Sequence, residues 1–118
     1  ISQRWSDSYA QAVLIIPSPT IYDAPKWTYY SCVEFAKWTL GKQGTSWGIA
    51  KNIQVNTYKP EIGLLILTNE GSLGHTGIVT SLTNNTVTFI EANYLPSQRT
   101  KRTLELIDSK IRGYRDVD

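Results

Sequence analysis

The chain contains one cysteine and one histidine, so the search for chemistry begins with these two residues. Cys32 follows Ser31 in the stretch SCVEFAKW, and His75 lies between two glycines in LGHTGIV. Farther along the chain, the segment FIEAN carries Glu91 and Asn93. A nucleophilic thiol needs a base within hydrogen-bond reach, and that base needs a third group that fixes its orientation. These side chains supply all three roles, with the third open between Glu91 and Asn93.

The thiol is predicted to lie at the beginning of a helix. Ser31 and Glu34 form the pattern of a capping box, in which the Ser31 hydroxyl accepts from the Glu34 amide and the Glu34 side chain returns to the Ser31 amide. Cys32 then occupies the first helical position, where free amides and the positive end of the helix dipole favour a thiolate. A lone cysteine among apolar residues is more often a small buried hydrophobe. This stretch by itself leaves both interpretations open.

The pattern of apolar residues predicts a helix followed by a run of strands. The helical pattern starts at Ser31 and stops at Gly41 and Gly44. A further short helix is predicted at residues 6–16, and the proline-rich residues 17–25 are predicted to be extended. Segments with strand composition are 64–67, 75–82, 86–93, 102–107 and 110–117. This order indicates an α+β domain with an antiparallel sheet of about five or six strands, rather than alternating βαβ units.

The pairing of the second and third predicted strands decides whether His75 meets the polar residues of its neighbour. Directly paired residues in an antiparallel hairpin share a face, and a slip of one residue turns every side chain to the other face. With a two-residue turn, His75 faces away from Glu91. A three-residue loop at residues 83–85 puts both on one face, with His75 opposite Asn93. The catalytic interpretation therefore predicts an odd-numbered loop or a bulge.

Composition excludes several kinds of site. The 118 residues suffice for one compact domain. One cysteine and one histidine are too few for an intrachain disulfide or a structural zinc site. The formal net charge of +2, with a small basic cluster at 99–102, does not indicate nucleic-acid binding, and the longest apolar run, 12–16, is far shorter than a membrane span. Since the chain contains no Met, we expect it to be part of a larger protein.

Six short stretches, taken in order, resemble the CHAP domain, the cysteine- and histidine-dependent amidohydrolase/peptidase family of the papain-like group. They are SCVEFAKW, WGIAKN at 47–52, PEIGLLIL at 60–67, GHTGIV at 74–79, IEAN at 90–93 and IRGY at 111–114. The resemblance covers most of the chain from about Trp27 onward. It implies that residues 1–118 form a single catalytic domain, with one or more N-terminal helices packed on a half-barrel-like antiparallel sheet in a papain-like core.

The resemblance also implies a role for each polar residue. Cys32 is the expected nucleophile and His75 the general base. Glu91 is expected to orient His75, and Asn93 is expected as a fourth polar member of the site.

The expected substrate-binding residues surround these four. Family members usually carry Gln or Asn before the nucleophile, where its amide helps to bind the oxyanion, and this chain has Ser31 in that place. We expect Tyr30 or Tyr29 to replace the missing donor. Trp47 and Tyr94 are expected to stack on sugars or to pack against peptides in a groove.

The reaction that the resemblance implies is cleavage of an amide bond in bacterial peptidoglycan. The bond lies either within the peptides or between muramic acid and the stem peptide. No cofactor or metal is expected, since only Asp23 offers a carboxylate where some relatives carry a calcium loop. We expect a monomer that acts outside the cell or in the cell wall, as a secreted hydrolase, a phage lysin or a virion-associated protein. Two alternatives remain: a cell-wall-binding module without turnover, and a papain-like hydrolase of a non-wall substrate.

Overall fold

The structure is a computed structural model that describes residues 21–118. Its elements are, in chain order, η1 Lys26–Tyr30, α2 Cys32–Thr39, η2 Ala50–Asn52, β1 Leu65–Thr68, β2 His75–Leu82, β3 Thr86–Ala92, β4 Arg99–Glu105 and β5 Ile111–Arg115. The strands form one antiparallel sheet in the order β4-β3-β2-β1-β5. This confirms the predicted α+β class, while the papain-like and half-barrel details stay predictions. The helix predicted at residues 6–16 lies outside the described residues.

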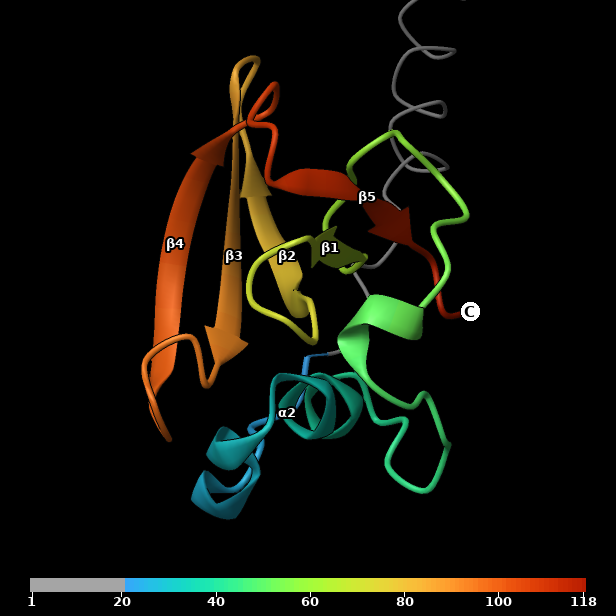
Figure 1. The fold of residues 1–118 in the computed structure, drawn as a ribbon, viewed down its shortest axis with the longest axis vertical. Coiled ribbons are helices and arrows are strands. Elements are labelled where there is room, and N and C mark those ends of the chain that lie inside the picture. The colour runs from blue at the N-terminus through green and yellow to red at the C-terminus, as the bar shows by residue number, and fades with distance from the viewer. Residues whose placement is uncertain (1–20) are drawn as a thin grey trace, which may run out of the picture.

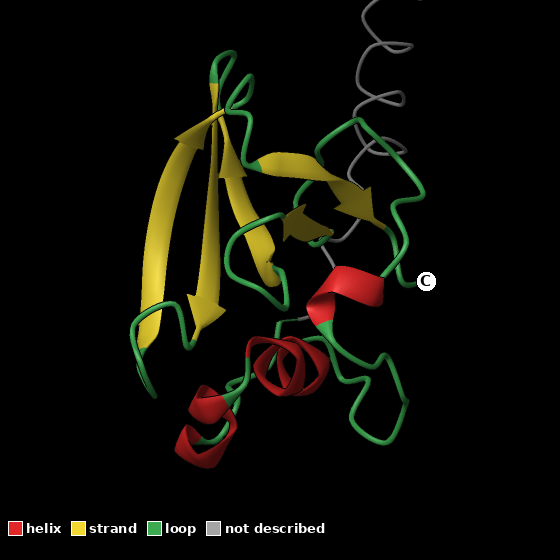
Figure 2. Ribbon diagram, viewed as in Figure 1, coloured by secondary structure: helices red, strands yellow, loops and turns green. Residues whose placement is uncertain are grey.

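The helices gather at one end of the sheet. Figures 1 and 2 show α2 and η1 beneath the end where β2 begins and β3 finishes. α2 packs against β2 and β3 as well as against η1. These contacts hold the beginning of α2 close to the beginning of β2.

Within the described part of the chain, no helix combines the length and the apolar character that crossing a membrane requires.

α2 begins where the sequence predicts, but only half of the capping box forms. The Ser31 hydroxyl accepts from the Glu34 amide at 3.2 Å. The Ser31 amide instead donates to the Thr28 carbonyl at 3.1 Å, and the Glu34 carboxylate lies 3.3 Å from the Lys37 ammonium. Because η1 already provides an acceptor for the Ser31 amide, Glu34 is free to pair along the helix. The predicted stop is confirmed at Gly41, whose φ of 70° lies in the left-handed region that favours glycine.

The hairpin of β2 and β3 joins a two-residue turn to a bulge. Near the turn Leu82 pairs with Val87, but farther along Val79 pairs with Phe89, so the register shifts by one residue between these pairs. The three-residue loop does not form, but the prediction of an odd-numbered loop or a bulge is confirmed by the bulge. A bulge sets two residues of one strand against one of the other and so changes which side chains share a face. This shift brings Glu91 onto the face of His75.

The outer strand β4 begins at Arg99, earlier than the predicted start at residue 102. Exposed and partly buried residues alternate along it, with Thr100 and Arg102 on the partly buried face. The basic cluster at 99–102 is therefore not a loop before the strand but its first half. The first half of β4 was not predicted because its charged residues do not have strand composition. An edge strand can carry such charges, since only one of its sides needs to be apolar.

Candidate active site

One end of the sheet brings the thiol and the imidazole together. Cys32 is the first residue of α2 and is partly buried. His75 is the first residue of β2 and is only 6% exposed. Both residues line the same cleft, and Cys32 contributes to the raised pKa of the imidazole. Because Nε2 of His75 is bonded to Glu91, Nδ1 is the ring nitrogen left for the thiol.

Glu91 is fully buried and holds the imidazole from the other side. Its Oε1 lies 2.7 Å from Nε2 of His75, while its Oε2 accepts from Thr100 Oγ1 and Arg102 Nε, each at 2.7 Å. Burial raises the pKa of Glu91, but the hydrogen bonds from His75, Arg102 and Thr100 lower it below its ordinary value. An ionised carboxylate therefore faces the imidazole, and of the two residues that the sequence left open, it is Glu91 that bonds His75.

The pKa of His75 is raised from 6.5 to about 9. Burial lowers this pKa, but the hydrogen bonds and charges of Cys32 and Glu91 together outweigh the effect of burial. The imidazole is therefore protonated at neutral pH. A protonated imidazole in this cleft is ready to donate a proton to a leaving group.

Sequence reasoning missed the residues behind Glu91. Arg102 binds Glu91 and also forms two hydrogen bonds to the carboxylate of Glu70, at 2.7 and 2.9 Å. Its guanidinium carbon lies 3.6 Å from the centre of the Tyr94 ring. The signal that could have found Arg102 is the alternation of residues 99–105, which puts it on the same face as Thr100.

A cleft of about 290 Å³ opens beside the thiol. Ser31, Cys32, His75 and Asn93 form much of its polar lining. Three large side chains at its edge are exposed, namely Tyr30 at 58%, Ile49 at 39% and Leu73 at 59%. Exposed apolar side chains around a polar reaction centre are typical of a substrate cleft. Ile49 and Leu73 could not be selected from the sequence, because only folding brings their loops to Cys32.

Asn93 and Tyr94 lie near the imidazole but are bound to other groups. Asn93 lines the cleft in a left-handed conformation with φ 64°, and its Oδ1 accepts from the Ser97 amide at 2.9 Å. It thereby shapes the loop between β3 and β4. The Tyr94 ring lies 6.0 Å from the His75 ring, and its face is occupied by Arg102.

Of the two tyrosines expected to assist the oxyanion, only Tyr30 lines the cleft. The Tyr29 ring packs edge-on against Phe35, with 5.7 Å between the ring centres. Ser31 lines the cleft as well, and its hydroxyl oxygen is already the acceptor for the first turn of α2.

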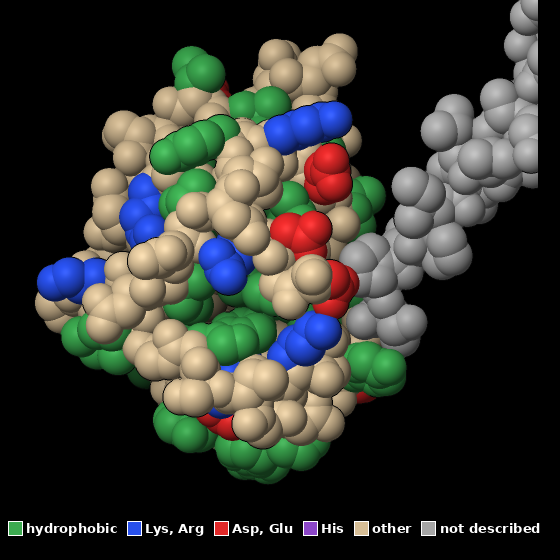
Figure 3. All heavy atoms as spheres, turned by 90° about the vertical axis from the view of Figure 1, so that its right-hand side faces the viewer, with side chains coloured by type: hydrophobic (Ala, Val, Ile, Leu, Met, Phe, Trp, Pro, Cys, Tyr) green, Lys and Arg blue, Asp and Glu red, His purple; other side chains and the backbone are tan. Residues whose placement is uncertain are grey.

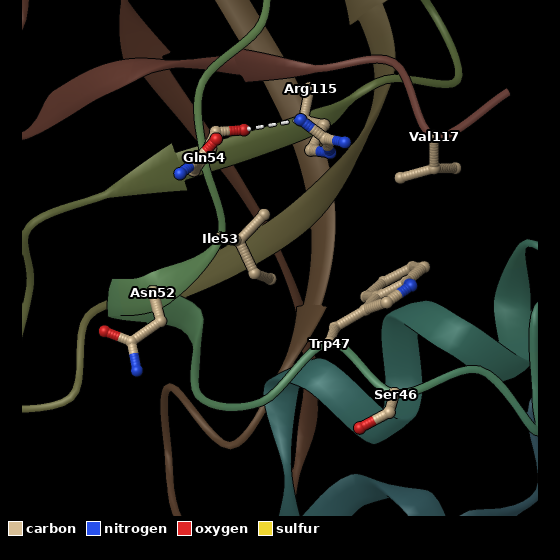
Figure 4. A pocket seen from close by; sticks show the side chains of 7 residues that line it. All are labelled: Ser46, Trp47, Asn52, Ile53, Gln54, Arg115 and Val117. Atoms are coloured by element: carbon tan, nitrogen blue, oxygen red, sulfur yellow. Dashed lines mark hydrogen bonds between the residues drawn. The ribbon is translucent and has the colours of Figure 1, made fainter.

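Trp47 is not brought to the cysteine cleft. It lines a separate pocket of about 240 Å³, which Figure 4 shows with its other lining residues, Ser46, Asn52, Ile53, Gln54, Arg115 and Val117. Residues 48–50 line the cysteine cleft, so this segment forms a wall between the two sites. The face in Figure 3 is hollowed, with hydrophobic side chains in the hollow and both basic and acidic side chains near it. Trp47 is therefore not among the residues that line the cysteine cleft.

Comparison with known proteins gives the family and supports the fold. The CHAP domain model matches residues 23–93, which include Cys32, His75 and Glu91. The crystal structure of Ly7917 is similar with a TM-score of 0.58 and 19% identity, covering 82% of this chain and 56% of that chain. A crystal structure of Ly7917 with the hydrolyzing product of MDP gives a TM-score of 0.56 and 22% identity, covering 71% and 52% of the two chains. At such identities the likeness concerns the fold alone.

This chain spans only a little over half of the length of those two structures. No curated protein matches it. Among residues 21–118, no three His, Cys, Asp or Glu side chains gather into a group that could hold a metal ion. The family match extends over more than half of the chain, and it contains the thiol, the imidazole and the carboxylate that the fold brings to one end of the sheet. The chain therefore belongs to the CHAP domain family.

Proposed function

We propose that this chain is a cysteine-dependent peptidoglycan hydrolase that cleaves an amide bond. The observation that carries the proposal is that Cys32 and His75 line one open cleft, with His75 hydrogen-bonded to the buried Glu91. A buried histidine between a thiol and a carboxylate is costly for a merely structural site, but it is what acyl transfer needs. Membership of the CHAP family supports the same reaction class.

The cleavage follows from the protonation states of the site. The Cys32 thiolate attacks the carbonyl carbon of the amide, and the C–N bond breaks as the protonated His75 gives its proton to the leaving amine. The neutral imidazole then takes a proton from water as the water oxygen attacks the thioester carbon. The C–S bond breaks, which releases the acid product and restores the Cys32 thiolate beside the protonated His75. Glu91 holds the imidazole through Nε2, which leaves Nδ1 toward the sulfur.

The negative charge on the substrate oxygen is stabilised at the beginning of α2. Cys32 is the first residue of this helix, so its amide has no acceptor within the helix and can donate to the oxyanion. Tyr30 is our candidate for a second donor, because it lines the cleft and is exposed. Ser31, which precedes the nucleophile, contributes by fixing the first helical turn through its bond to the Glu34 amide.

Peptidoglycan is our proposed substrate for two reasons. Ly7917, whose fold is similar, has been crystallised with the hydrolyzing product of MDP. In addition, a depression of about 330 Å³ adjoins the cleft at Gly74 and is lined by Lys51 and Arg112, two cations that suit the carboxylates of a peptide substrate. We propose that the protein meets this substrate outside the cell or in the wall, as a secreted hydrolase or a phage lysin does.

The proposal is tested with purified sacculi from several bacteria, followed by mass spectrometry of the released fragments. We expect fragments with new amino and carboxyl termini from the wild-type chain and none from Cys32→Ala. New termini within peptides identify an endopeptidase, and free stem peptides beginning with an alanine amine identify an amidase.

Labelling of the single thiol separates the alternatives. We expect rapid alkylation of Cys32 by iodoacetamide at about pH 6, where an ordinary thiol is almost unreactive, and slow alkylation in His75→Ala. Slow labelling together with no released fragments would contradict hydrolysis and favour a wall-binding module. Rapid labelling with no fragments from any sacculus would contradict only the wall substrate.

A further inference from the structure

The most heavily bonded side chain near the cleft touches neither the thiol nor the imidazole. Arg102 donates from Nε to Glu91 Oε2 at 2.7 Å and from one terminal nitrogen to Glu91 Oε1 at 3.0 Å. The same guanidinium also donates to both carboxylate oxygens of Glu70, at 2.7 and 2.9 Å. Its planar array of donors therefore joins β4, β3 and the loop between β1 and β2.

This double attachment fixes the plane of the Glu91 carboxylate. Thr100 Oγ1 adds a third donor, at 2.7 Å from Oε2. With Oε2 taken by two donors, Oε1 is the oxygen presented to Nε2 of His75. Glu70 is held in turn, because its Oε1 also accepts from Thr68 Oγ1 at 2.9 Å. A rotation of Glu91 would break several charge-assisted bonds at once.

Two aromatic rings shield this network. The guanidinium carbon of Arg102 lies 3.6 Å from the centre of the Tyr94 ring and 5.1 Å from that of Phe89. The Arg102 side chain is 15% exposed, and that of Glu91 is 0% exposed. Ionic hydrogen bonds are stronger where water is excluded, and arginine stacks on aromatic faces more readily than lysine does. Tyr94 therefore covers the ion pair, which explains its position better than a groove for sugars does.

We infer that Arg102 is a positioning residue for the proposed hydrolysis, which aims the Glu91 carboxylate at His75 and so keeps the imidazole in line with Cys32. This inference rests on the proposed function but reaches a residue outside the cysteine cleft. The charged and titratable groups that face the imidazole are Cys32 from α2, Glu91 from β3, Glu70 from the loop before β2, and Tyr94 after β3, with Arg102 behind Glu91.

The decisive variant is Arg102→Lys, which keeps the positive charge and loses the planar fork. The chain has one histidine and one cysteine, so nuclear magnetic resonance follows the titration of His75 without ambiguity, and alkylation reports only on Cys32. We expect the midpoint of the His75 titration to fall from about 9 toward 6.5. Alkylation of Cys32 at about pH 7 should slow roughly tenfold or more, and kcat should fall with little change in KM.

Lys101→Ala is the matched control, because Lys101 is the neighbouring residue on β4, is exposed, and lies on the other side of the strand. It removes a charge at almost the same place, and we expect no change in any of the three measurements. If Arg102→Lys leaves the His75 titration and the alkylation rate unchanged, the inference is wrong. If Arg102→Ala raises the midpoint, Arg102 acts through its charge alone, which would also overturn the positioning role.

Glu70→Asp keeps the test decisive if Arg102→Lys fails to fold. It keeps the charge near His75, shortens the side chain that anchors Arg102, and changes no residue of the cleft. We expect a smaller shift of the His75 midpoint in the same direction, and an unchanged midpoint would contradict the inference. Because neither titration nor alkylation uses peptidoglycan, a failure of the wall assay with the wild-type chain would overturn the substrate and not the role of Arg102.

Discussion

The two walls of the cysteine cleft are built differently. On the sheet side, His75 and Glu91 are buried and tied into a network of hydrogen bonds that spans three strands. On the loop side, Tyr30, Ile49 and Leu73 are exposed at 39% or more and come from separate segments. The contrast indicates that the sheet sets the geometry of the reaction, while the loops supply contacts that a substrate completes.

The largest loss of activity is expected from substituting Glu91, the central residue of the hydrogen-bond network on the sheet side. Glu91→Gln preserves the size of the side chain but removes the charge that faces His75 and Arg102. We expect kcat on peptidoglycan to fall by roughly 100- to 10,000-fold, because the imidazole loses the group that orients it and favours its protonated form. The measurement is initial rates of fragment release. Glu105→Gln, at the exposed end of β4, should retain full activity, and equal losses in both variants would refute the assignment.

The buried ion pairs of the same wall predict how stability depends on pH. His75 has a pKa of about 9 in the fold against an ordinary 6.5. Its contribution to the free energy of unfolding is therefore complete below about pH 6.5 and lost as the pH rises through about 9, a loss of at most about 3 kcal/mol. On the acid side the pKa values of Glu91 and Glu70 are lowered, so stability falls there as these carboxylates are protonated.

Urea unfolding at about pH 6 and about pH 10 measures this loss through the free energy of unfolding. In His75→Gln the difference between the two pH values should be clearly smaller than in the wild-type chain. A difference of the same size in both proteins would show that other groups cause it.

A smaller effect is expected from a substitution that forces β2 and β3 apart. A Cβ added at Gly77 would lie 2.7 Å from the Ile90 carbonyl oxygen and 2.7 Å from the Phe89 ring. Since both are packed in the sheet, Gly77→Ala should cost about 1–3 kcal/mol of unfolding free energy. It should also slow alkylation of Cys32, because Glu91 and His75 share this face. Ser81→Ala, at an exposed position of β2, serves as the control for denaturant unfolding, and an equally stable Gly77→Ala would count against a tightly set register.

A substitution in the loop wall should have the smallest effect, and it should change KM rather than kcat. Leu73→Ala removes an exposed apolar contact at the edge of the cleft. We expect KM to rise roughly three- to tenfold with kcat unchanged, equivalent to about 1 kcal/mol of binding. Alkylation of Cys32 should not change. Ile107→Ala, at an 88% exposed aliphatic residue outside the cleft, is the matched control. A lower kcat for Leu73→Ala would contradict the assignment of the loop wall to substrate binding alone.

Local patterns in the sequence determined the elements and the order of the polar residues. Ser31 predicts the beginning of α2, and Gly41 predicts its end, because capping and left-handed backbone depend on neighbouring residues alone. The strand 75–82 was predicted with the bounds that β2 has. The chemistry that His75 and Glu91 require excluded a regular hairpin with a two-residue turn, but it left the longer loop and the bulge open.

The tertiary structure alone decided which polar residues meet. Asn93 and Glu91 lie two residues apart, and the sequence could not choose between them, because the choice depends on the bulge in β2 and on donors from β4. From the sequence, Arg102 is only one member of a basic cluster, and Trp47 is expected in the substrate groove. Ion pairs and pocket walls join segments far apart in the chain, so their partners are fixed only when the sheet has formed and water has been excluded.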